Sequence, residues 1–103
     1  MSKLKNKTAF VTGGSRGIGA GIVEELATQG ANVIFTYVSS DQKAKELVDL
    51  IESLGVKGKA IKADTGNKQD IESAIRSATE LGKIDILVNN EGLFINGAVD
   101  DES

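Results

Sequence analysis

The 103-residue sequence contains no cysteine and no histidine. Without cysteine, the chain has no disulfide, no thiolate nucleophile and no cysteine metal site, and nothing in it points to an oxidising compartment. Without histidine, it has no Ser-His-Asp triad, no imidazole general base and none of the commonest metal ligand. We therefore predict no metal site in this chain.

The sequence also has little positive charge and no long apolar run. Its 12 basic residues are outnumbered by 15 acidic ones, for a net charge of -3, and they are scattered along the chain. Nucleic-acid binding would need a concentrated basic patch, so we expect no such partner. The apolar run after the basic start stops at Gly13, too short for a signal peptide or a membrane span. We expect a cytoplasmic protein that does not enter a membrane.

Short apolar runs alternate with helical stripes along the whole chain. The runs predict strands over residues 8–12, 32–37, 59–63 and 84–88, the third of mixed polarity like a sheet edge. Between them, apolar residues at helical spacing predict three helices. Their stripes are Ile18, Ile22, Val23, Leu26 and Ala27, then Ala44, Leu47, Val48, Ile51 and Leu54, then Ile71, Ala74, Ile75, Ala78 and Leu81.

The expected ends of these helices carry recognisable signals. Gly30, Gly55 and Gly82 stand where left-handed C-caps would end the three helices. Ser39 and Gln42 have the spacing of a capping box, and Asn67 is suited to cap the third helix. Strands and helices that alternate with short connections predict one α/β domain over residues 1–103, with a parallel sheet and right-handed crossovers.

A glycine-rich loop follows the first predicted strand. Gly13, Gly17 and Gly19 allow sharp turns and a close approach of the backbone to a ligand, and the next helix would point its free N–H groups at a phosphate. The spacing departs from G-x-G-x-x-G, because Ile22 stands where the third glycine would fall. A tight strand-to-helix connection without a ligand is the alternative. A strand order 3-2-1-4 would place this loop and residues 89–92 around one crevice.

Three segments in order resemble the short-chain dehydrogenase/reductase family, specifically its 3-oxoacyl-(acyl carrier protein) reductase-like members. Residues 12–19 resemble the cofactor loop T-G-x-x-x-G-I-G, Asp64-Thr65 resembles the adenine-contacting pair, and residues 85–92 resemble D-x-L-V-N-N-A-G. The likeness covers the first half of the family's pattern and implies half of a Rossmann-like fold with four strands and three helices. It implies cofactor contacts at Gly13, Ser15, Arg16, Gly17, Ile18, Gly19, Tyr37, Ser39, Asp64, Thr65, Asn90 and Gly92.

The end of the second predicted strand bears on the type of cofactor. A carboxylate there would bind the ribose 2′-OH of NAD and repel the 2′-phosphate of NADP, but this sequence has the neutral Tyr37. Asp41 lies at the distance quoted for the ribose acid, yet it more simply complements the dipole of the second helix. Arg16, Ser39 and Ser40 can donate to a phosphate. The sequence therefore favours NADP over NAD.

The sequence departs from the family pattern in two ways, one that concerns cofactor binding and one that concerns catalysis. Glu91 replaces an alanine beside the expected dinucleotide, and a like-charge contact at ~4 Å would cost about 4 kcal/mol at an effective dielectric near 20. If Glu91 points to solvent, this electrostatic cost is small. The sequence therefore leaves open whether the crevice binds the dinucleotide or stays empty. The family's catalytic serine, its Y-x-x-x-K pair and its assisting asparagine lie beyond the matched segment. Tyr37 is the only tyrosine and Asp41 stands four residues on, so we assign no catalytic residue.

Three functions follow from different classes. The first is the NADP-binding half of a carbonyl or 3-oxoacyl reductase, truncated and inactive by itself. The second is a non-catalytic, vestigial nucleotide-binding module. The third is an assembly module, because a strand over 84–88 would lie at an exposed sheet edge and invite self-association into a homo-oligomer. Residues 93–103 are expected to form a tail that covers part of this edge or frays.

Overall fold

The computed structural model describes residues 3–13, 17–39, 41–63, 67–80 and 83–88. Its four strands are β1 (Thr8–Val11), β2 (Asn32–Tyr37), β3 (Gly58–Lys62) and β4 (Ile86–Val88). All pair in parallel, in the order β3-β2-β1-β4. The predicted α/β class and strand order are therefore confirmed. The order reverses between β1 and β4, which lie side by side although β4 is the last strand in the chain.

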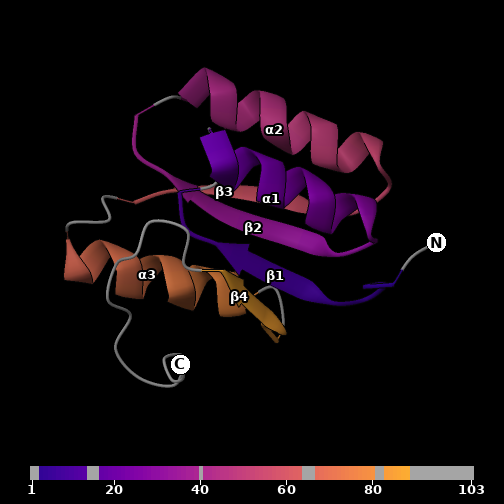
Figure 1. Ribbon diagram of the computed structural model, residues 1–103. Helices are drawn as coiled ribbons and strands as arrows, with labels where there is room; N and C mark the ends of the chain where they lie inside the picture. Colours follow the sequence, from indigo (N-terminus) through magenta and orange to yellow (C-terminus); the bar gives the residue numbers. More distant parts are fainter. Residues whose placement is uncertain (1–2, 14–16, 40, 64–66, 81–82, 89–103) are drawn as a thin grey trace.

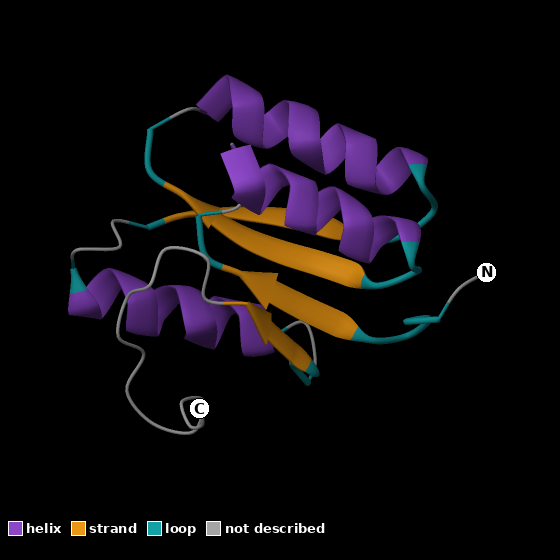
Figure 2. Ribbon diagram, in the orientation of Figure 1, coloured by secondary structure: helices purple, strands orange, loops and turns teal. Residues whose placement is uncertain are grey.

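Three helices cover the two faces of this sheet unequally. Helices α1 (Gly17–Thr28) and α2 (Asp41–Ser53) lie together on one face, and α3 (Lys68–Thr79) lies on the other (Figure 1). Figure 2 shows the resulting three layers, with the orange strands between two helices and one. Right-handed crossovers explain this arrangement. The connections through α1 and α2 lead outward from β1 to β3, whereas the connection through α3 leads back past β1 to β4, so α3 lies on the opposite face.

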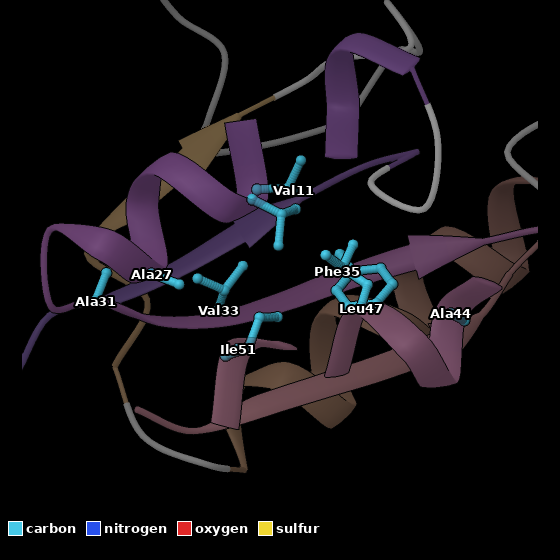
Figure 3. Close-up of a cluster of buried hydrophobic side chains, with 9 residues drawn as sticks. Val11, Ala27, Ala31, Val33, Phe35, Ala44, Leu47 and Ile51 are labelled. Atoms are coloured by element: carbon cyan, nitrogen blue, oxygen red, sulfur yellow. The ribbon is translucent and has the colours of Figure 1, made fainter. Parts of the chain in front are cut away.

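The central strands are buried on both faces, which explains their unbroken apolar sequence. Alternate residues of β1 and β2 face α1 and α2, where strand side chains such as Phe35 and helix side chains such as Leu47 belong to one cluster (Figure 3). The intervening residues face α3. The first cluster contains Val11, Val23, Ala27, Ala31, Val33, Phe35, Ala44, Leu47 and Ile51, and the second contains Phe10, Ile34, Ala63, Ala74 and Ala78.

The helix ends use several of the predicted signals. The side chain of Asn67 accepts hydrogen bonds from the N–H groups of Gln69 and Asp70 at the start of α3. Gly30 has φ 100°, its N–H donates to Ala27, and the next N–H donates to Leu26. This is the Schellman arrangement that satisfies the last carbonyls of a helix. Gly55 likewise has positive φ after α2, whereas Gly82 lies outside the described residues.

Four details differ from the sequence predictions. Helix α2 begins at Asp41, and the Gln42 amide donates to the Glu46 carboxylate at 3.2 Å, so the predicted Ser39–Gln42 capping box does not describe this helix start. Leu54 is 42% exposed because α2 ends at Ser53, before the stripe reaches it. Ile18 lies in the first turn of α1 and is 78% exposed, so the predicted stripe does not bury it. The last strand is shorter than expected, beginning at residue 86.

Gly58 marks the closest approach of α2 to the edge strand β3. A Cβ built there would lie 2.9 Å from Cγ2 and 3.0 Å from Cβ of Ile51, which is fully buried. Both atoms belong to a β-branched side chain that has little freedom to turn away. The absence of a side chain at position 58 therefore sets the distance between the helix and the strand.

We predict that Gly58→Ala lowers the free energy of unfolding by about 1–3 kcal/mol, the usual cost of an extra methyl group in a packed core. Gly21→Ala is the matched control, since a Cβ there meets nothing within 4 Å and the glycine is exposed in the middle of α1. The control should gain up to about 1 kcal/mol from helix propensity. Urea unfolding measures both, and equal stability of the two variants would contradict the predicted clash.

Candidate functional site

The segments that the sequence assigns to a cofactor emerge at one edge of the sheet. In a parallel sheet the carboxyl ends of all strands share that edge. Two backbone hydrogen bonds connect these ends: Thr12 N–H donates to Val88 at 3.0 Å, and Ala63 N–H donates to Tyr37 at 2.9 Å. The chain thus leaves β1, β2, β3 and β4 at neighbouring points. This is the edge, at the reversal of strand order, where open α/β sheets bind ligands.

The glycine loop starts from a fixed position between β2 and β4. Gly13 N–H donates to Oγ1 of Thr36 at 2.9 Å, and the Thr36 side chain is fully buried on β2. On the other side, Thr12 is fully buried and is bonded to β4 through its backbone N–H. The first turn of the loop is therefore held by both neighbours of β1 before the chain passes into the residues that the structure does not describe.

Two loop glycines have backbone conformations that other residues rarely adopt. Gly13 has φ 67° and Gly17 has φ 61°, both in the left-handed region. A Cβ added to Gly17 would meet nothing within 4 Å, so free space adjoins the start of α1. Gly19 differs, because it is buried inside the helix and does not have positive φ. The prediction of special backbone geometry thus holds for Gly13 and Gly17, whereas Gly19 is a buried residue with ordinary helical geometry.

The start of α1 is suited to a negatively charged ligand. Its first turn contains no acidic residue, whereas the first turns of α2 and α3 contain Asp41 and Asp70. The positive end of the α1 dipole is therefore not balanced by a carboxylate of its own first turn. Ile18 presents a large exposed apolar side chain at the same point. The free space beside Gly17, the uncompensated dipole of α1 and the apolar surface of Ile18 together fit the pyrophosphate and ribose of a dinucleotide.

A polar cluster lies where β2 passes into α2. Tyr37 and Lys62 are register partners on β2 and β3, and Nζ of Lys62 lies 3.9 Å from Oδ1 of Asp41. Burial raises the pKa of the Tyr37 hydroxyl, and a hydrogen bond to Asp41 and the charge of that carboxylate raise it further. Ser39 is exposed and lines an open hollow beside this cluster, together with Asp41, Gln42, Lys43 and Glu46.

Half of the predicted cofactor residues can be placed. Gly13, Gly17, Ile18 and Gly19 lie at the start of the loop or of α1, and Tyr37 and Ser39 follow along the same sheet edge. The predicted contacts Ser15, Arg16, Asp64, Thr65, Asn90 and Gly92 lie outside the described residues, as do Glu91 and the predicted tail. The described residues that precede these segments, Gly13, Ala63 and Val88, are all held at the same edge.

Two residues of this edge were not assigned to the site from the sequence. Thr36, which holds the loop, differs from its neighbours only as a hydroxyl residue within an apolar run. Lys62, whose ammonium lies 3.9 Å from the Asp41 carboxylate, is the last residue of β3. In the sequence, Thr36 stands out only as a polar residue at a position expected to be buried. Nothing in the sequence marks Lys62, because its partner Asp41 belongs to α2 and not to the same strand.

Among the described residues, no three acidic, histidine or cysteine side chains gather to hold a metal ion. The helices in this part of the chain include none that is long and apolar enough to cross a membrane.

Comparison with known proteins agrees with the geometry of this edge. The chain is 39% identical over 102 residues to an uncharacterised oxidoreductase of Methylorubrum extorquens, covering 98% of this chain and 41% of that protein. It is 40% identical over 89 residues to a 3-oxoacyl-(acyl-carrier-protein) reductase of Staphylococcus epidermidis, covering 85% of this chain and 36% of the reductase.

A solved structure shows the same relationship in three dimensions. A short-chain dehydrogenase from Burkholderia cenocepacia, determined in complex with NADP, is 45% identical and superposes with a TM-score of 0.85. The superposition covers 98% of this chain and 42% of the Burkholderia protein. The chain thus spans well under half the length of the relatives it matches. The family model described as short chain dehydrogenase matches residues 7–103, and the chain therefore belongs to that family.

Proposed function

We propose that this chain forms the NADP-binding part of a carbonyl or 3-oxoacyl reductase of the short-chain dehydrogenase family. The observation that carries the proposal is the loop after β1, held by Thr36 and ending in the left-handed Gly17 beside free space. In the bound state the cofactor supplies the hydride for reduction of a carbonyl group. The residues of this chain bind and orient it. The N–H groups at the start of α1 receive the pyrophosphate, and Ile18 covers an apolar part of the ligand.

The end of β2 supports NADP as the cofactor. An acidic residue at this point would favour NAD, but Tyr37 is neutral at the pH of the cell, since its pKa is raised above the ordinary value for tyrosine. The nearest carboxylate considered from the sequence, Asp41, is paired with Lys62 and hydrogen-bonded to Tyr37. Lys62 therefore offsets part of the negative charge of Asp41. The Burkholderia relative was solved with NADP, which agrees with this choice.

The sequence analysis offered a vestigial module and an assembly module as alternatives. The relatives reported above are reductases or oxidoreductases, which gives neither alternative support. The arrangement of the edge likewise favours ligand binding, because Gly13 and Gly17 keep left-handed conformations that a simple strand-to-helix turn does not need twice.

Binding of NADP+ tests the proposal directly. We expect isothermal titration of the 103-residue chain to give a saturable isotherm, and Gly17→Ala to weaken binding by about tenfold or more. The added methyl group strains a residue at φ 61° by about 1–2 kcal/mol and occupies the space that the pyrophosphate would approach. Gly21→Ala, one turn later on the exposed side of α1, should bind like the parent chain. Absence of any isotherm would refute the proposed cofactor site.

Reduction of a substrate needs groups that the 103 residues do not contain in recognisable form. The only tyrosine, Tyr37, hydrogen-bonds Asp41, and no lysine stands four residues after it. Hydride transfer to a carbonyl requires an acid that protonates the developing alkoxide. We therefore expect the purified 103-residue chain to bind NADPH without oxidising it in the presence of an acetoacetyl thioester. A turnover above the blank in the absorbance of NADPH would contradict this.

The expected self-association through residues 84–88 stays a prediction. Within the described residues β4 pairs only with β1, and its three side chains are partly exposed, whereas those of β1 from Ala9 to Val11 are buried. An open edge of this kind pairs readily with another strand. Sedimentation velocity of the 103-residue chain at micromolar concentration should therefore show a dimer. A single folded monomer over a tenfold range of concentration would contradict it.

A further inference from the structure

The discrimination between NADP and NAD depends on the charge beside the ribose 2′ position. In dinucleotide-binding sheets this position lies at the carboxyl end of β2, where an acid selects the 2′-OH and a cation accommodates the 2′-phosphate. In this chain β2 ends at Tyr37, which carries no charge. Position 41 adds a carboxylate at the start of α2, close enough to hydrogen-bond the tyrosine hydroxyl. A dianionic phosphate arriving there would be repelled unless a positive charge lies next to it.

Lys62 places that positive charge at the end of β3. It is the register partner of Tyr37, so the two side chains leave neighbouring strands on the same face, toward the start of α2. Its ammonium nitrogen lies 3.9 Å from the Asp41 carboxylate. Tyr37, Asp41 and Lys62 thus form one cluster, drawn from three consecutive elements, at the point where the 2′ substituent is read.

The ion pair is too exposed to have an important role in stability. The side chains of Lys62 and Asp41 are 61% and 70% exposed, and exposed pairs of this kind contribute little to folding. An ammonium on a flexible four-carbon stem is also free to exchange partners. A phosphate dianion has more charge and more acceptor oxygens than the carboxylate, so it can draw Lys62 away from Asp41. The Tyr37 hydroxyl remains protonated and is able to donate to the same phosphate.

We propose that Lys62 is a specificity-determining residue, which pairs with Asp41 in the free chain and with the 2′-phosphate of NADP in the bound one. This inference rests on the proposed function, because it assumes that the adenosine end of the cofactor lies at the end of β2. It assigns opposite effects to two neighbouring charges: Lys62 favours the phosphorylated ribose and Asp41 opposes it.

Small fragments of the cofactor isolate this interaction. We would titrate 2′,5′-ADP and 5′-AMP into the 103-residue chain and follow amide shifts by NMR. Lys62→Gln should weaken binding of 2′,5′-ADP by about tenfold, the effect of one charge-assisted hydrogen bond at an exposed site, and change 5′-AMP less than twofold. Asp41→Asn should tighten binding of 2′,5′-ADP about threefold, because it removes the repulsion and frees Lys62. Both variants should unfold at the same urea concentration as the parent.

Lys59→Gln is the matched control. It removes the same charge from the same strand, but Lys59 is the register partner of Ile34 and lies nearer the amino end of β3. It faces the α3 side of the sheet, so it should leave both affinities unchanged. An unchanged preference for 2′,5′-ADP in Lys62→Gln, or an equal loss in Lys59→Gln, would overturn the inference and leave the proposed NADP site standing. If the parent chain binds neither NADP+ nor 2′,5′-ADP, the proposed function and this inference are both refuted.

Discussion

The candidate site depends on a single constraint: the backbone leaving β1 must turn sharply while its polar groups stay paired. The strand is buried on both faces, so an unpaired N–H at its end would cost about 1–3 kcal/mol. Thr36 removes this cost for Gly13 by placing a hydroxyl oxygen 2.9 Å from its N–H group, and Val88 accepts from Thr12. These two bonds fix the point at which the chain leaves β1, between its neighbours β2 and β4.

The need to pair the backbone groups at the end of β1 also relates the fold to the candidate site. Thr36 is a fully buried hydroxyl residue within the apolar run of β2, and its oxygen accepts the hydrogen bond from Gly13 at the start of the loop. The sheet also fixes the neighbours of the loop. Ala63 and Val88, which precede the predicted adenine and crevice segments, are bonded to Tyr37 and Thr12. The described residues that precede these segments are thereby held at one edge of the sheet, although they are far apart in the sequence.

Much of this arrangement was predictable from the sequence because its signals are periodic or positional. The stripes of α2 and α3 identified the buried residues Leu47, Ile51 and Ala74, and the caps at Asn67 and Gly30 were read correctly. Both Ile18 and Leu54 match the helical period but are exposed, since Ile18 lies in the first turn of α1 and Leu54 lies just after the end of α2. Periodicity gives the direction of a side chain around a helix and does not say where the sheet beneath it stops.

Contacts between elements were beyond the reach of sequence reasoning. The spacing of Asp41 from the glycines allowed two roles, a ribose acid and a partner for the helix dipole, and nothing in the sequence chose between them. The structure adds Lys62, whose position follows from the register of β3 against β2. The register of β3 against β2 thus brings a cation beside this acid, and residue type and spacing along the chain do not reveal that juxtaposition.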